Sequence, residues 1–171
     1  MMFVRWALVL VVVFAVATSA AAQTFVRDSA TSISLRVPEG WIATSRHGFV
    51  SVREEEPDGM PRYLVSILVE ELAGQRVRID QYKRIMYETH YEHYGAPQRW
   101  VQRDTTFRGM PAFIVDFSYP YGGDGEEISV RRIVAFRERT AFLISAESRE
   151  ERWRELLQQY SAMLTTLTLP K

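Results

Sequence analysis

Cysteine is absent from this 171-residue chain, and its absence excludes several kinds of protein. Without cysteine there is no disulfide framework, no thiolate nucleophile and no cysteine-ligated zinc site. A lipoprotein is also excluded, because no thiol is available for acylation. If the chain is exported, its core alone must stabilise it, which fits a bacterial envelope protein better than a small secreted eukaryotic one.

A net charge is also lacking. The chain has 21 basic and 21 acidic residues, and the two signs are interspersed rather than grouped in blocks. A balanced surface of this kind gives no electrostatic basis for binding nucleic acid or an anionic membrane. We therefore expect no nucleic-acid partner.

The sequence motifs of common catalytic sites are missing as well. The chain has no G-x-S-x-G elbow for a serine nucleophile, and no G-x-G-x-x-G or G-x-x-x-x-G-K loop for phosphate groups. Serine, histidine and aspartate are present, but hydrolytic catalysis needs them within hydrogen-bond reach of one another. These absences favour a binding protein over an enzyme, and we expect no cofactor.

The N-terminal segment has the features of a cleavable export signal. Arg5 provides a positive charge, and an apolar run follows over residues 6–17. Alanines at positions 20–22 then supply the small side chains that a signal peptidase requires before Gln23. These features predict a signal peptide over residues 1–22.

Cleavage at this point would leave a mature domain over residues 23–171 without a transmembrane segment, in the periplasm or outside the cell. The apolar run has 12 residues, whereas a membrane-spanning helix needs about 20. Residues 18–22 lengthen the run, so a retained membrane anchor is the alternative.

Apolar stretches separated by short turns predict an antiparallel sheet of about six to seven strands. Residues 33–37 alternate between apolar and polar side chains, which indicates a strand with one buried face. Residues 62–71 and 140–147 are apolar on both faces and are therefore expected near the centre of the sheet. A tight turn is expected at residues 138–139, and a loose polar start at residues 24–31.

Two amphipathic helices are expected to pack on this sheet. The first spans residues 79–94, and helical spacing assigns these side chains to its apolar face: Ile79, Tyr82, Ile85, Met86, Thr89 and His93. The second helix follows a capping box of Ser148 and Glu151. Its apolar stripe contains Trp153, Leu156, Leu157, Tyr160, Leu164 and Leu167. The sequence therefore predicts an α+β fold with a single antiparallel β-sheet and two main helices on it.

Two histidines of the first helix are candidate metal ligands. His90 and His93 are three residues apart, so both imidazoles can reach one ion on the same side of the helix. His47 is a candidate third ligand from elsewhere in the chain. The alternative is that His93 packs at the edge of the apolar face while His90 is solvated.

Three tyrosines of the same helix are candidates for a partner-binding surface. At about 100° per residue, Tyr87, Tyr91 and Tyr94 lie at about 80°, 120° and 60° from Ile79. This placement is away from the expected apolar face. Tyrosine supplies a large contact area with a polar tip, which is typical of protein interfaces. The alternative is that a neighbouring loop covers the three rings.

The order of several short motifs resembles the PsbP-like family. "ISLRVPEGW" at residues 33–41 is similar to the family's opening strand with its Pro-x-Gly-Trp turn. "FRGMPAFIVDF" at residues 107–117 is similar to its mid-domain hairpin, and the closing strand, helix and "LTLP" tail also match. The resemblance spans roughly residues 32–169 and implies a central antiparallel sheet with helices packed on it.

The same resemblance implies a binding or assembly protein rather than an enzyme. The fold group includes the PsbP subunit of photosystem II, DcrB-type envelope lipoproteins and a Ran-binding import factor, whose partners differ. The sequence therefore predicts an exported, non-catalytic binding or assembly-accessory protein of the bacterial cell envelope that has a protein partner. The alternatives are a small metal-dependent hydrolase and a carrier that holds a small apolar ligand between sheet and helix.

Overall fold

The computed structural model describes residues 24–57, 61–72, 78–121 and 126–170, so the predicted signal peptide lies outside the described residues. The strands and helices follow in the order β1 Thr24–Arg27, β2 Ser34–Val37, β3 Ile42–Arg46, β4 Phe49–Glu55, β5 Pro61–Glu71, α1 Ile79–Tyr94, β6 Trp100–Phe107, β7 Met110–Tyr121, β8 Glu126–Arg137, β9 Thr140–Arg149 and α2 Trp153–Thr166. Within these residues, neither helix combines the length and apolar character needed to cross a membrane.

The main sheet has seven antiparallel strands in the order β3-β4-β5-β9-β8-β7-β6. This arrangement confirms the predicted α+β class with one large antiparallel sheet. The two strands predicted to be central, β5 and β9, pair with each other near the middle of the sheet. Their side chains are apolar on both faces because each face of the sheet is covered over part of its area.

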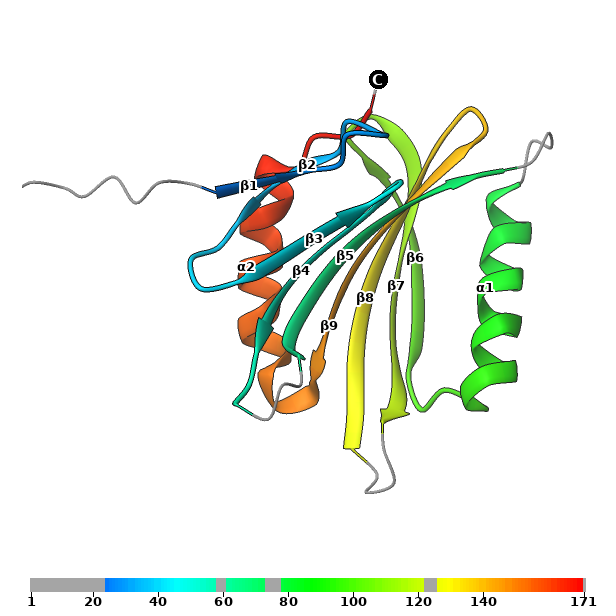
Figure 1. The fold of residues 1–171 in the computed structure, drawn as a ribbon. Coiled ribbons are helices and arrows are strands. Elements are labelled where there is room, and N and C mark those ends of the chain that lie inside the picture. Colours follow the sequence, from blue (N-terminus) through cyan, green and yellow to red (C-terminus); the bar gives the residue numbers. More distant parts are fainter. Residues whose placement is uncertain (1–23, 58–60, 73–77, 122–125, 171) are drawn as a thin grey trace, which may run out of the picture.

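The two helices lie on opposite faces of the sheet and cover different halves of it (Figure 1). The stripe of α2 packs on β9, at Ile144, and on β2, and the same buried core contains Val52 of β4 and Ile67 of β5. On the other face, α1 packs over β7 and β8, where Phe117 and Val130 are buried. Successive residues of a strand point to opposite faces, so β9 contributes to both cores.

The N-terminal segment is more ordered than the sequence indicated. Residues 24–27 were expected to be a loose start, but they form β1, which pairs with β2 in a separate two-stranded sheet. A backbone bridge between Ser34 and Thr168 ties this sheet to the end of the chain. Asp28 fixes the turn after β1 and accepts hydrogen bonds from Thr31 N at 2.8 Å and Gly48 N at 3.1 Å. The expectation failed because a short polar strand depends on such tertiary contacts rather than on its own pattern.

The start of α2 also differs from the prediction. The expected capping box of Ser148 and Glu151 is absent, because Ser148 belongs to β9 and its hydroxyl bonds to the carbonyl of Arg149. A short 3-10 turn over Glu150–Arg152 joins the strand to the helix instead. The apolar stripe was predicted correctly, since its central members Leu156 and Tyr160 are buried.

Candidate functional site

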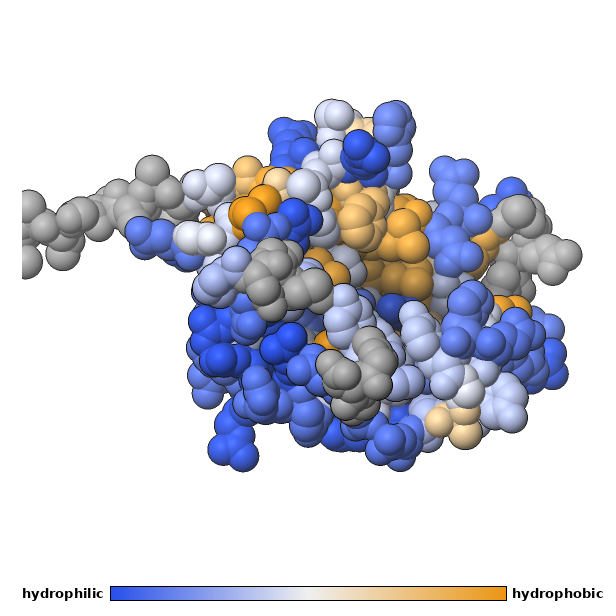
Figure 2. All heavy atoms as spheres, turned by 60° about the horizontal axis from the view of Figure 1, so that its bottom comes forward, coloured by the Kyte–Doolittle hydropathy of each residue, from blue (hydrophilic) through white to orange (hydrophobic). Residues whose placement is uncertain are grey.

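A groove of about 570 Å³ lies between α1 and the sheet. Its apolar lining includes Met86 of α1, Trp100 of β6, Phe117 of β7 and Leu143 of β9, together with Leu72, which follows β5. Figure 2 shows apolar side chains gathered in this hollow, with hydrophilic residues around it. The groove is therefore an apolar depression with a polar rim, which is the usual construction of a small-molecule site.

The groove exists because α1 meets the sheet along a narrow line of side chains. The ring of Tyr82 packs 5.3 Å from that of Phe136, and the ring of His90 packs 5.0 Å from that of Phe117. On the neighbouring side of the helix, Ile85 is 54% exposed although it is apolar. The helix thus covers one part of the sheet and leaves the adjoining part open.

The apolar face of α1 is rotated from the predicted one. Ile79, Tyr82 and Met86 pack on the sheet as expected, but His90 replaces His93 as the next member. His90 is only 6% exposed, whereas Thr89 and His93 are exposed. The prediction failed because the sheet carries aromatic rings at this point, and these accept an imidazole as a packing partner.

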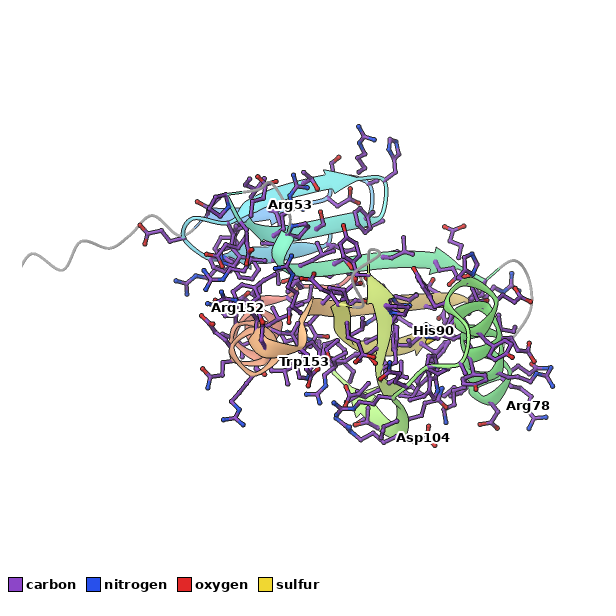
Figure 3. The ribbon with its side chains drawn as sticks, turned by 90° about the horizontal axis from the view of Figure 1, so that it is seen from below. Arg53, Arg78, His90, Asp104, Arg152 and Trp153 are labelled. Atoms are coloured by element: carbon purple, nitrogen blue, oxygen red, sulfur yellow. The ribbon has the colours of Figure 1, made fainter. Side chains whose placement is uncertain are left out.

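His90 is the most unusual polar group of the site (Figure 3). Its ring lies 5.0–5.2 Å from the rings of Tyr94, Trp100 and Phe117. Its Nε2 atom is buried and has no hydrogen-bond partner among the described residues. Burial lowers the pKa of His90, and the positive charge of Arg132 lowers it further. The imidazole is therefore neutral at neutral pH.

Two carboxylates of the groove are each bound by a tyrosine. The Tyr82 hydroxyl donates a hydrogen bond to Glu70, and the Tyr119 hydroxyl donates one to Glu147 at 3.2 Å. Burial raises the pKa of both tyrosines above the usual range, and the neighbouring carboxylates raise it further. Both tyrosines are therefore protonated and act as hydrogen-bond donors in the groove.

Arg132 is the cation of the groove, and the sequence analysis did not identify it. It lies on β8, and its Nε donates a hydrogen bond to Ser145 Oγ at 2.8 Å. Its guanidinium carbon is 5.6 Å from the centre of the Phe117 ring. The signal for it was nevertheless present in the sequence. Val130 and Val134 flank it on one face of β8, so an arginine interrupts an otherwise apolar alternation.

The predicted histidine pair shares the groove but differs in environment. His90 and His93 both line it, and the Nδ1 of His93 is 2.7 Å from the carbonyl of Thr89. His47 lies in the turn between β3 and β4 and is not part of the lining. The described ranges contain no group of three or more histidine or acidic residues arranged to hold a metal ion. Metal binding by the pair stays a prediction, which the metal content of the purified protein tests.

The three predicted interface tyrosines have different surroundings. Tyr94 stacks on Tyr119 with ring centres 4.7 Å apart and forms part of the groove wall. Tyr87 packs edge-on against Trp100 at 5.1 Å, and Tyr91 is 55% exposed. A role for all three in a partner interface stays a prediction. Loss of a captured partner on Tyr91→Ser substitution, at an unchanged melting temperature, would support it.

No family model matches the chain. No curated protein matches it either. Solved structures do match. One is LpqN, which is involved in cell envelope biogenesis in Mycobacterium tuberculosis, with a TM-score of 0.62 and 13% identity over 87% of this chain and 91% of that one. Another is the cyanobacterial PsbP of Synechocystis, with a TM-score of 0.59 and 14% identity over 90% and 95% of the two chains.

A third match is a protein of unknown function from Pseudomonas aeruginosa. Its TM-score is 0.58 at 13% identity, over 87% of this chain and 99% of that one. The likeness extends over most of each chain, and it confirms the fold expected from the sequence motifs. The protein has a PsbP-like fold.

Proposed function

We propose that this protein is an exported, non-catalytic binding protein of the cell envelope, and that its binding site is the groove between α1 and the sheet. One observation carries the proposal. A groove of about 570 Å³ falls within the range of about 300–1,000 Å³ that is typical of small-ligand sites. Its few polar groups stand among apolar and aromatic side chains, which is also typical of such sites.

The polar groups of the groove support a binding function rather than a catalytic one. The two carboxylates are engaged by tyrosine hydroxyls, and the imidazole of His90 is packed among aromatic rings. A general base must instead be within hydrogen-bond reach of a reacting group. Export is supported by the basic and apolar N-terminal segment. A location in the envelope is supported by LpqN, which shares this fold and is involved in cell envelope biogenesis.

Native mass spectrometry of the protein isolated from the cell envelope tests the proposal. We expect a fraction of the wild-type protein to carry a small molecule, seen as an added mass. Ile85→Trp places a large ring at the rim of the groove and should remove this added mass. Tyr91→Trp is the matched control on the same helix, because Tyr91 does not line the groove. An added mass that persists in Ile85→Trp would place the ligand elsewhere.

A further inference from the structure

The charges of the groove indicate which class of ligand it accepts. Among the described residues, Arg132 makes one hydrogen bond, from Nε to Ser145, and takes part in no ion pair. A guanidinium has five N–H donors in a planar fork. Donors of Arg132 are therefore available to an acceptor atom of a ligand in the groove.

The other charges disfavour a charged ligand of either sign. Glu70 and Glu147 give the lining two negative charges against the one positive charge of Arg132, and His90 is neutral. An anionic head group bound at Arg132 would face both carboxylates. A cationic head group would face the guanidinium, and like charges repel.

The remaining lining suits the body of an apolar molecule. Met86, Phe117 and Leu143 line the groove, and Ile85 adds exposed apolar surface at its rim. Burial of such surface stabilises a complex by roughly 25 cal/mol per Å² before the cost of association is subtracted. Most of the affinity would therefore come from an apolar chain, and the orientation from one polar group.

We propose that the groove binds an uncharged amphiphile, with its apolar body along Met86 and Leu143 and a hydroxyl or carbonyl oxygen accepting hydrogen bonds from Arg132. This inference rests on the proposed function, because it assigns a ligand class to the same groove. The unpartnered Nε2 of His90 is a second polar group on the same wall. That atom is buried from solvent, so the hydrogen bonds to the ligand come from Arg132.

Three probes with the same chain and different head groups test the ligand class: 1-decanol, decanoate and decylammonium. Their affinities are measured by calorimetry, and their location by the methyl resonance of Met86. Met163, a buried residue of α2 in the core on the other face of the sheet, provides the internal control. We expect 1-decanol to bind about tenfold more tightly than either ion, since a mismatched charge outweighs one hydrogen bond.

Variants of the charged groups make the test specific. Arg132→Met should weaken 1-decanol binding about tenfold and should strengthen decylammonium binding, because only the carboxylates remain. Arg53→Met is the matched control, since Arg53 pairs with Glu55 outside the groove. An unchanged Met163 resonance confirms that each variant is folded.

The outcomes separate the two proposals. If none of the probes shifts the Met86 resonance, the groove is not the binding site and the proposed function fails as well. If decanoate or decylammonium binds most tightly while Met86 responds, the groove is a binding site but the uncharged class is wrong. If Arg132→Met and Arg53→Met weaken 1-decanol binding equally, the hydrogen-bonding role proposed for Arg132 is wrong.

Discussion

Replacing Leu156 by alanine is expected to lower the free energy of unfolding by about 2–5 kcal/mol. Leu156 lies on α2 and is fully buried in the core that this helix forms with β2 and β9. Truncation removes its apolar contacts and leaves a cavity that a sheet and a helix cannot close without moving. For a domain of this size the melting temperature should fall by roughly 10 °C, measured by calorimetry or circular dichroism.

Two neighbours on α2 provide graded controls for this prediction. Leu157 is half-buried, so Leu157→Ala should cost less than Leu156→Ala. Gln158 is exposed, and Gln158→Ala should change the stability by less than about 0.5 kcal/mol. Equal effects at all three positions would mean that α2 is not packed on the sheet as described.

Replacing Asp116 by alanine is expected to cost about 3 kcal/mol, because it breaks a buried ion pair. Asp116 is 4% exposed, and its carboxylate accepts hydrogen bonds from Arg131 Nε at 2.7 Å and Arg131 Nη2 at 2.9 Å. Arg103 approaches the same carboxylate at 3.3 Å. The loss is placed at the lower end of the usual range because the Arg131 side chain is still 26% exposed.

The same ion pair predicts a pH dependence. Burial by itself would raise the pKa of Asp116, but the hydrogen bonds and charge of Arg131, and then of Arg103, outweigh it and hold the pKa below its usual value. The stabilisation is therefore complete above about pH 4, the ordinary range of an aspartate, and is lost as the pH falls through the lowered value. Urea titrations should show a constant difference between wild type and Asp116→Ala near neutral pH, which shrinks in acid.

A double variant distinguishes a lost ion pair from a lost packing contact. Asp116→Val combined with Arg131→Met removes both charges together and should recover much of the stability lost in Asp116→Ala. If the double variant instead loses the sum of the stabilities lost in the two single variants, Asp116 and Arg131 are not a coupled pair.

The central strands of the sheet and the limits of α1 followed from local patterns in the sequence, whereas the start of α2 did not. β5 and β9 are apolar on both faces, and this pattern alone placed them in the centre of the sheet. α1 was predicted to its observed ends, since Ile79 opens the apolar spacing and Gly95 stops it with a positive φ of 78°. β1 was missed because it is short and polar, and its pairing with β2 depends on contacts distant in the sequence.

The groove itself could not be predicted from periodicity. Its lining combines α1 with strands that are far apart in the chain, and its depth depends on where α1 is positioned on the sheet. The sequence did place polar and apolar residues on α1, but it assigned His93 rather than His90 to the buried face. Nothing in the spacing indicated that the rings of Trp100 and Phe117 would surround His90. Arg132 could have been noticed as the polar exception among the apolar residues on one face of β8.

A single fluorescent label tests the binding role of the groove most directly. Because the chain has no cysteine, Thr89→Cys introduces one attachment point at the rim of the groove, and Gln158→Cys introduces one on the exposed side of α2. The groove account predicts that lipid extract from the cell envelope changes the emission at position 89 saturably and leaves position 158 unchanged. It also predicts that Ile85→Trp abolishes the response. No response at position 89, or equal responses at the two positions, would contradict it.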